Sequence, residues 1–523
     1  MTMAAHRTEG NKELLVSINP ATLEEIGTVE LMNQEQIRTV IAKAESAALV
    51  WGALPLGDRI RYLRAAQQYI VEHIDEIADI ISQKMGKPRI EALTADIMTV
   101  VDLISYFAKI APRLLADRKL DLHLFKLVKE SKIVYQPLGV VAVIAPWNFP
   151  FAIPMSGIVA ALLAGNAVVF KPASDVPFIG KKIDQVFKAA GLPDGVFNLI
   201  LAAGKNVGTT LYEPPIRKVV FTGSTEVGKQ IMAKAGENLI PAVMELGGKD
   251  PMIVLDDADI DKAVGGALWG ACTNAGQVCA SVERLYVQET IYDDFVARLT
   301  EKVKTLRVGA GSDPHTDMGP VVNEGQVKIA ATHVEDARKK GATIVSGSTP
   351  ETGSQGYFFP PTLILNANHQ MRCVMEETFG PTLPVMKFKT DEEAISLAND
   401  STYGLTASVW GRNLKRAEKV ARQVEAGTVM INDALMSYGI TDTPWQGVKE
   451  SGIGRSHGPE GLLEFTFPKH ISIDHTPRMM RRMLWWYPYS QGGYEMFKNA
   501  IQSVFGRKGR LGSLAKLLGS LGK

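Results

Sequence analysis

Charged and apolar residues alternate at helical spacing through residues 34–118. The stretch 60–70 is typical, because its apolar residues recur every three or four positions while arginines and glutamines fill the positions between them. This pattern predicts several amphipathic helices that each pack one face on a core. Residues 119–137 then change to short strand-like runs, among them 131–137.

From Gly139 onward, largely apolar runs alternate with helical stretches. Four such runs lie at 140–144, 167–170, 196–200 and 218–221. Strands buried on both faces have this continuous apolar character, and parallel strands joined by helices are buried on both faces. The pattern therefore predicts a parallel sheet covered by helices on both sides. A second strand-and-helix series runs to about Val448.

Residues 138–170 carry no charged residue and form a stretch longer than the ~20 apolar residues that cross a membrane. Prolines and glycines interrupt it at Pro146, Pro150, Pro154, Gly139, Gly157 and Gly165. We therefore expect short buried strands and a buried helix here rather than a membrane span.

Composition narrows the class of protein. A chain of 523 residues is too long for one core and predicts two or more domains. Its 57 basic and 56 acidic residues nearly balance, so the overall charge does not indicate a nucleic-acid partner. The nine histidines show no H-x-x-x-H pattern and no Cys/His pattern, so we expect no metal site.

The three cysteines, Cys272, Cys279 and Cys373, are odd in number and lack Cys-x-x-Cys spacing. This usage argues against a disulfide framework and favours a reducing compartment. Residues 1–30 lack the apolar segment of a secretory signal peptide. We therefore expect a cytoplasmic protein in which Cys272 and Cys373 are buried and unreactive.

Cys279 is the candidate nucleophile, because it follows Gly276 and Gln277 and lies 34 residues after Glu245, a carboxylate beside a Gly-Gly pair. The reactive form of a cysteine is the thiolate, and an ordinary thiol with a pKa of about 8.5 is mostly protonated at neutral pH. Glu245 can assist as a general base acting through water. On these residues alone, a packed structural cysteine explains Cys279 equally well.

The segments 274–279, Asn-Ala-Gly-Gln-Val-Cys, and 245–249, Glu-Leu-Gly-Gly-Lys, resemble the two signatures of the NAD(P)-dependent aldehyde dehydrogenase superfamily. The resemblance covers roughly residues 15–475. It implies an α/β fold with a Rossmann-type cofactor domain, an α/β catalytic domain and a small β arm for oligomerisation into a homodimer or homotetramer. The implied ranges are 1–118, 138–245 and 448–464 for the cofactor domain, 246–447 for the catalytic domain, and 119–137 with 465–475 for the arm.

The resemblance also implies roles for three residues. Cys279 attacks the aldehyde carbon to form a thiohemiacetal and then a thioester. Asn148, within Pro-Trp-Asn-Phe-Pro at 146–150, donates its amide to the developing oxyanion, although an asparagine in such a setting can also simply cap a turn. Glu245 then activates the water that hydrolyses the thioester to the free acid.

A glycine turn that opens a helix, at 221–229, is a phosphate cradle by its backbone N–H groups. It is not a Walker A motif, because Gln230 stands where Ser or Thr would be required. The resemblance assigns Gly223 and Ser224 to the cofactor pyrophosphate. It assigns Glu377 and Phe379 to positioning the nicotinamide side, and Trp147 and Gly247 complete the expected cofactor-binding set.

Lys171 and Ser174 bear on the choice between NAD and NADP. In members of the family that prefer NAD, a glutamate stands where this chain has Ser174. A carboxylate repels a 2′-phosphate, whereas a hydroxyl accepts it and Lys171 attracts it. We expect use of NAD or NADP, with dual or NADP use modestly favoured, because the adjacent Asp175 partly restores the repulsion.

The substrate is expected to be an uncharged aliphatic or aromatic aldehyde. Succinate-semialdehyde dehydrogenases are the nearest branch by resemblance, but many carry an arginine where this chain has Ser156. Neighbours of Ser156 are apolar, namely Phe151, Pro154 and Met155. The alternatives are a succinate-semialdehyde dehydrogenase, a CoA-acylating enzyme, which typically lacks the base at Glu245, and an inactive structural homologue.

The C-terminal extension, 476–523, lies outside the resemblance. From residue 477 it carries nine basic residues and one acid, a net charge of +8, while the rest of the chain carries −7. Apolar residues at 494–505 and 511–521 recur at helical spacing, and Trp485, Trp486, Tyr487 and Tyr489 precede them. Basic amphipathic segments with aromatic residues bind membrane surfaces. We expect either a peripheral membrane contact or an arm packed on the acidic body or on a neighbouring subunit.

Overall fold

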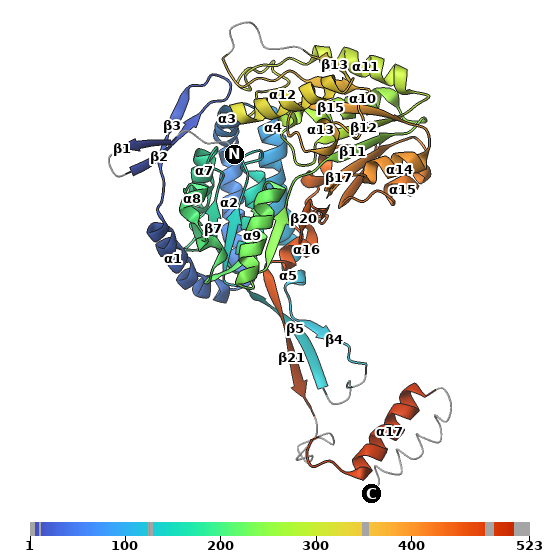
Figure 1. Cartoon of the computed structure of the whole chain (residues 1–523). Coiled ribbons are helices and arrows are strands. Elements are labelled where there is room, and N and C mark those ends of the chain that lie inside the picture. The colour runs from blue at the N-terminus through green and yellow to red at the C-terminus, as the bar shows by residue number, and fades with distance from the viewer. Residues whose placement is uncertain are drawn as a thin grey trace. The chain divides into compact units, whose positions relative to one another are not determined.

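The computed structural model describes residues 6–9, 12–123, 125, 129–347, 355–475 and 486–506. The chain forms two compact units, one made of residues 1–116 and 135–468 and the other of residues 117–134 and 469–523 (Figure 1). The first unit contains both large sheets and all the site residues predicted from the sequence.

The N-terminal part of the first unit is helical, as the spacing predicts. A three-stranded sheet comes first, with the strands β1 (His6–Glu9), β2 (Lys12–Ile18) and β3 (Glu25–Glu30). The helices of residues 34–114 follow, and they are α1 (Gln34–Ala53), α2 (Leu56–Glu72), α3 (Ile74–Met85), α4 (Arg89–Glu91) and α5 (Met98–Leu114). A capping box starts α1, where Asn33 and Gln36 each accept a hydrogen bond from the other's backbone N–H. A π-helical turn, η1 (Ala92–Ile97), joins α4 to α5 and was not predicted.

The first large sheet has the strand order β20-β10-β9-β6-β7-β8. Its strands are β6 (Val140–Ile144), β7 (Ala167–Lys171), β8 (Phe197–Leu199), β9 (Ile216–Thr222), β10 (Ala242–Glu245) and β20 (Gly452–Ile453). All neighbours are parallel except β20, which pairs antiparallel with β10. The four strands predicted from apolar runs are therefore confirmed, within two residues at each end.

Alternate residues of these strands face two separate cores, as a period of two requires. Val141 and Val143 pack with α2, α5, α6 (Ala152–Leu163) and α7 (Pro177–Ala189). Ala142 and Ile144 pack with α1 and α9 (Thr225–Glu237). Every residue of α6 is buried, which explains the uncharged stretch 138–170 as two buried strands around a buried helix.

The second large sheet has the order β13-β14-β15-β12-β11-β17-β18 and is parallel apart from β13 at its edge. Helices cover both faces, with α10 and α11 on one core and α12, α14 and α15 over the other. The bounds are β11 (Asp250–Val254), α10 (Ile260–Cys272), β12 (Val282–Gln288), α11 (Tyr292–Thr305), α12 (Glu324–Lys339), β13 (Thr343–Ser346), β14 (Thr362–Leu365), α13 (Arg372–Met375), β15 (Thr382–Phe388), α14 (Asp391–Asn399), β17 (Thr406–Trp410), α15 (Leu414–Ala421) and β18 (Thr428–Ile431).

A smaller sheet has the order β21-β5-β4 and contains the strand-like run predicted at 131–137. Its strands are β4 (Arg118–Leu120), β5 (Lys129–Pro137) and β21 (Thr466–Asp474). In the second unit, α17 (Gln491–Phe505) confirms the first of the two helices predicted in the extension. The second, at 511–521, and Trp485 lie outside the described residues.

Within the described residues, no single helix has the length and apolar character needed to cross a membrane. Helices α1 and α2 meet these criteria only as a pair, bent by 116° at the break between them. Both bury one face in the interior of the first unit, which is the ordinary behaviour of core helices.

Candidate active site

Two hollows meet at Cys279. A cleft of about 270 Å³ lies on one side and a cavity of about 340 Å³ on the other, and Cys279 lines both. Of the predicted residues, Trp147, Asn148, Gly223, Ser224, Gly247, Glu377 and Phe379 line the cleft. Glu245 lines the cavity. The fold therefore brings residues from 147 to 379 around one sulfur atom.

The turn before Cys279 has an unusual backbone. Asn274 (φ 53°), Ala275 (φ 55°) and Gly276 (φ 73°) are all left-handed, in the 3-10 segment η3 (Thr273–Gly276). Such a conformation costs about 1 to 2 kcal/mol for a residue other than glycine. At Gly276 a Cβ would stand 2.3 Å from the backbone of Gly380, so only glycine fits there.

Hydrogen bonds from three directions offset this strain. The Glu91 carboxylate accepts the backbone N–H of Asn274 at 3.1 Å to each oxygen. Gln277 is fully buried, donates to Asn274 O at 2.8 Å and accepts the backbone N–H of Val322 at 2.8 Å. Gly276 and Gln277, which precede Cys279 in the sequence, thus stabilise the turn that leads to Cys279.

Asn148 is buried and is held mainly through its backbone. Its carbonyl oxygen accepts Lys87 Nζ at 2.8 Å and Asn274 Nδ2 at 3.0 Å. Its own Nδ2 donates to Gln277 O at 3.2 Å, which uses one of the two amide N–H groups. Lys87 in turn pairs with Asp96 at 3.2 Å, with both side chains fully buried.

Asp96 links this pair to the helix behind the site. Its second carboxylate oxygen accepts the backbone N–H groups of Phe151 and Ala152, at the start of α6. A carboxylate is favoured at a helix N-terminus by the free N–H groups and the helix dipole. The π-helical turn η1 carries Asp96 into this position. No motif in the sequence pointed to Lys87, Glu91 or Asp96.

Glu245 is the last residue of β10 and is buried. Burial raises its pKa to about 7, against hydrogen bonds from the Ser456 and Thr222 hydroxyls that lower it. Ser456 donates directly to Glu245 Oε1. A carboxyl with a pKa near 7 is half ionised at neutral pH, which suits a general base. Ser456 was not predicted as a site residue.

The resting thiol of Cys279 is protonated. Burial raises its pKa above the ordinary range, and the nearby carboxylates of Glu245, Asp250 and Glu377 raise it further, while the backbone N–H of Ala280 opposes them. Attack on a carbonyl therefore requires that a base remove the proton, because only the thiolate is a strong nucleophile. Cys272 and Cys373 are both buried, as predicted.

Backbone groups build much of the cleft. Ser224 is the N-cap of α9 and makes no side-chain capping bond, so the first-turn N–H groups of α9 are open to a ligand at that end. A Cβ at Gly247 would lie 2.6 Å from the Glu377 carboxylate, and one at Gly248 would lie 2.2 Å from Cys279 O. These donors and close approaches fit a phosphate-bearing dinucleotide.

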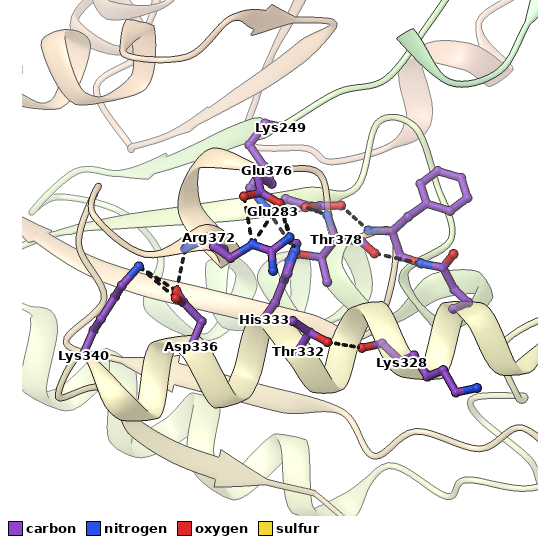
Figure 2. A network of polar contacts seen from close by, with 12 residues as sticks. Lys249, Glu283, Lys328, Thr332, His333, Asp336, Lys340, Arg372, Glu376 and Thr378 are labelled. Carbon is purple, nitrogen blue, oxygen red and sulfur yellow. Dashed lines mark hydrogen bonds and ion pairs between the residues drawn. The ribbon is translucent and has the colours of Figure 1, made fainter. Parts of the chain in front are cut away.

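A polar network fixes the loop that carries Glu377 and Phe379 (Figure 2). In this network the Glu283 carboxylate accepts Lys249 Nζ at 2.5 Å and the backbone N–H groups of Thr378 and Phe379 at 2.8 and 2.9 Å. Lys249 and Glu283 are both buried, so removing either would leave an unpaired buried charge, at a cost of about 3–5 kcal/mol.

The two glutamates at 376 and 377 have different surroundings. Glu376 forms an ion pair with Arg372 at 2.7 Å and lies 3.5 Å from His333 Nε2 (Figure 2). Glu377 instead accepts the backbone N–H of Gly248 at 3.0 Å and lines the cleft. Burial, with Glu283 nearby, raises the pKa of Glu377 to about 8. Only Glu377 is thus placed to touch a ligand in the cleft.

Lys171 and Ser174 do not line the cleft around Cys279. Lys171 ends β7, which is separated from β10 by the strands β9 and β6 of the same sheet, and its Nζ donates to Pro172 O at 3.3 Å. Burial lowers the pKa of Lys171 to about 8, while the negative charge of Asp175 raises it. Asp175 also accepts a hydrogen bond from Asn323 and lies near Lys84. The carboxylate next to Ser174 is therefore already engaged.

The cavity is walled by apolar side chains from segments far apart in the chain. Its inner wall includes Phe149, Ile153, Val278, Leu435, Tyr438 and Trp445. Tyr438 packs edge-on against Trp445, with ring centroids 5.1 Å apart. Among the described residues that line the cavity there is no lysine, arginine or histidine. Ser156, which takes the place of the family's arginine, is buried in α6.

In the part of the chain that the structure describes, no group of three or more His, Cys, Asp or Glu residues has an arrangement that could hold a metal ion.

The profile of the aldehyde dehydrogenase family matches residues 7–471. A Methylomonas sp. protein named 4,4'-diapolycopene aldehyde oxidase is 38% identical over 498 residues, which cover 95% of this chain and 92% of that protein. Because this alignment covers 95% of the chain, it includes part of the C-terminal extension, whichever residue the alignment starts from. A probable NADP(+)-linked succinate-semialdehyde dehydrogenase of Sinorhizobium fredii is 38% identical over 466 residues, 89% of this chain and 94% of that protein.

Among solved structures, betaine aldehyde dehydrogenase from Staphylococcus aureus in complex with NAD+ has a TM-score of 0.86 and 37% sequence identity. The likeness covers 91% of this chain and 94% of that chain. A structure described as an Escherichia coli NADP-dependent enzyme has a TM-score of 0.84 and 36% identity, over 88% and 95% of the two chains.

Proposed function

Since the chain belongs to the aldehyde dehydrogenase family, it oxidises an aldehyde to a carboxylic acid, and we propose that this aldehyde is uncharged and apolar. The family assignment confirms the resemblance and the fold class predicted from the sequence. The observation that carries the substrate proposal is the apolar cavity at Cys279, whose described lining offers no cation. A carboxylate in it would lose its hydration without gaining a partner.

In this proposal Cys279 is the nucleophile, and Asn148 Nδ2 with the N–H of the nucleophile stabilises the oxyanion. Glu245, held by Ser456, takes the proton of the water that hydrolyses the thioester. The presence of Glu245 in the cavity wall supports release of a free acid rather than transfer to CoA.

The cofactor in the proposal is NAD or NADP, which when bound supplies the hydride acceptor. Gly223, Ser224 and the first turn of α9 hold its pyrophosphate, while Trp147, Gly247, Glu377 and Phe379 position its nicotinamide side. Lys171 and Ser174 lie at the adenosine end. Relatives named for NADP(+) and a neighbour solved with NAD+ both support the wider choice of NAD or NADP.

Relatives named for succinate semialdehyde are about as similar as the one named for an aldehyde of diapolycopene, so identity alone does not select a substrate. The apolar cavity favours an aldehyde with a hydrocarbon chain over one that carries a carboxylate. Three aromatic side chains, Phe149, Tyr438 and Trp445, also line it, and aromatic faces can hold a quaternary ammonium. Betaine aldehyde, named for the Staphylococcus aureus neighbour, is therefore the second candidate.

The test is a cofactor-reduction assay with octanal, benzaldehyde, succinate semialdehyde and betaine aldehyde, each with NAD and NADP and with and without CoA. We expect kcat/KM to be highest for octanal or benzaldehyde, with no need for CoA and with the free acid as product. Preference for succinate semialdehyde or betaine aldehyde would replace the substrate proposal. Dependence on CoA would indicate the acylating reaction, and inactivity with every aldehyde would indicate a silent homologue.

We further propose that the chain forms a homodimer or homotetramer through the arm. In the described residues β21 is an edge strand, paired with β5 alone, and Phe467 on it is exposed. Edge strands offer unpaired N–H and C=O groups to a second chain. Light scattering on the purified chain measures this directly, and a monomeric mass at micromolar concentration would contradict it.

We propose, finally, that the C-terminal extension touches an anionic membrane surface. On α17, Tyr494, Ile501 and Phe505 are each more than half exposed and lie on one face, and Trp486 and Tyr487 before it are exposed as well. The net charge of +8 over 477–523 adds electrostatic attraction of about 1 kcal/mol for each basic residue near an anionic leaflet.

Co-sedimentation with anionic and neutral liposomes at low and high salt tests the membrane contact, with the full chain compared against one that ends at Asp474. Only the full chain should pellet, and mainly with anionic liposomes at low salt, because salt screens the attraction. Equal behaviour of the two chains would favour the alternative, an arm packed on protein.

A further inference from the structure

The mouth of the substrate cavity is apolar and exposed. Met98 in α5, Trp269 in α10 and Met436 in the 3-10 segment η4 (Met436–Gly439) all line the cavity, yet they are 54%, 46% and 44% exposed. A side chain that lines a cavity and is about half exposed lies at its opening. These three residues, here called the collar, come from three different elements.

The collar continues the apolar inner wall to the outside. In the described lining only Glu245, Cys279 and Tyr438 can ionise, and the collar contributes no charge. Methionine and tryptophan are the side chains best suited to an apolar chain of variable shape, because methionine adapts its form and tryptophan offers a large flat surface. Single exposed apolar residues are ordinary, but three of them gathered at the mouth of one pocket indicate a binding surface.

The size of the cavity sets a limit on what it can enclose. Its volume of about 340 Å³ is at the small end of the roughly 300–1,000 Å³ that ligand pockets span. The aldehyde carbon must reach Cys279 at the inner end, where Glu245 also lies. An apolar chain that runs outward from Cys279 reaches the collar, because the collar lines the exposed end of the same cavity.

We propose that the collar is a second subsite that binds the distal part of a long-chain apolar aldehyde whose carbonyl lies at Cys279. The proposal rests on the function proposed above and names the substrate class more closely, as aldehydes with a hydrocarbon chain longer than the cavity. Collar residues touch only the distal chain. They stabilise the ground state and the transition state equally, so their effect falls on KM rather than kcat.

The test compares butanal, hexanal, octanal and decanal, all below their solubility limits, with the full-length enzyme and the double variant Met98→Gln/Met436→Gln. Glutamine keeps the length of methionine and both sites are exposed, so folding should be unaffected. We expect kcat/KM of the wild type to keep rising with chain length up to decanal. The double variant should lose about tenfold for decanal, through KM, and less than about twofold for butanal.

Met232→Gln, a matched change at a methionine on α9 that is 37% exposed and lies outside the cavity lining, serves as the control and should change neither value. A second measurement is the inhibition of butanal oxidation by 1-decanol and by 1-butanol. It reports binding alone, because the alcohol serves as an inhibitor and not as a substrate. The double variant should weaken inhibition by 1-decanol but not by 1-butanol.

The outcomes separate the two proposals. A loss that is the same for all chain lengths, or a wild-type kcat/KM that stops rising at hexanal, would overturn the collar while leaving aldehyde oxidation in place. Failure to oxidise any of the four aldehydes would instead overturn the proposed apolar substrate itself.

Discussion

The cleft and the cavity on the two sides of Cys279 are built in different ways. The cleft uses main-chain groups and charged side chains that come from short motifs, such as Gly223-Ser224, Gly247-Gly248 and Glu377. The cavity uses mainly apolar side chains spread from Thr94 to Trp445, and apart from Phe149, Glu245, Val278 and Cys279 they lie outside the motifs recognised in the sequence. A cofactor shared by many enzymes requires the same backbone geometry each time, whereas a substrate requires only a volume and a polarity.

This difference also separates the roles of the two hollows in the chemistry. In the proposed function the cleft orients charged phosphates by backbone N–H donors, which any residue supplies. Its side chains are therefore restricted only where a Cβ would collide, as at Gly248. The cavity excludes water and offers dispersion contacts, so single changes in it adjust specificity. Changes near Cys279 should therefore affect both hollows, and changes farther away only one.

Cys279→Ala removes the atom common to both hollows and should have the largest effect. Oxidation of any aldehyde and hydrolysis of any ester should fall at least about 10⁴-fold, since no other cysteine lines either hollow among the described residues. Steady-state rates measure this, and Cys272→Ala, at a buried cysteine, should retain nearly full activity. Residual activity in Cys279→Ala comparable to the wild type would remove Cys279 from the mechanism.

Glu245→Gln changes a residue that lines the cavity but not the cleft. Rapid mixing should show a surviving burst of reduced cofactor followed by a steady state slowed about 10²- to 10³-fold, because the base for hydrolysis is lost while thioester formation continues. The exposed Glu289→Gln provides a charge-matched control. If burst and steady state fall together, Glu245 assists the attack of Cys279 rather than hydrolysis.

Ser456→Ala should shift the pH dependence of hydrolysis. The Glu245 carboxyl acts as a base only when ionised, and its pKa of about 7 places this limb of the profile near neutral pH. The Ser456 hydroxyl stabilises the ionised form, so its loss raises the pKa and moves the limb about one unit to higher pH. The rate near pH 6 should fall about tenfold and recover near pH 9.

The pH-rate profile under thioester-limited conditions measures this shift. Ser408→Ala removes a buried serine hydroxyl away from Glu245 and should leave the profile in place. A uniform loss of rate at all pH values would mean that Ser456 acts through packing rather than through the carboxylate.

Ser174→Glu changes a residue outside the cleft lining, at the proposed adenosine end of the cofactor, and should have the smallest effect. A carboxylate at this position repels a 2′-phosphate, so the NADP-to-NAD ratio of kcat/KM should fall about fivefold. The exposed Ser346→Glu adds the same charge elsewhere and should leave the ratio unchanged. An unchanged ratio in Ser174→Glu would assign the cofactor preference to Asp175 or to another group.

Much of the fold could be read from the sequence because its signals are local. The strand Val140–Ile144 and the helix of residues 34–53 follow from continuous and amphipathic apolar patterns. The π-helical turn at Ala92–Ile97 could not be read, because its backbone is determined by the inward-facing Asp96 and its contacts with Lys87 and α6. No local pattern encodes a contact between residues 87 and 148.

The residues of the site also differ in whether local sequence or tertiary contacts reveal them. The sequence by itself determined which residues are predicted to react or to bind phosphate, because Cys279, Glu245 and Gly223 belong to short local motifs, the first two of which resemble the signatures of the family. Only the tertiary structure decided how Ser456 holds Glu245, how Lys87 and Asn274 hold Asn148, and how Met98, Trp269 and Met436 surround the mouth. The physical reason is that these contacts join segments tens to hundreds of residues apart, which folding alone brings together.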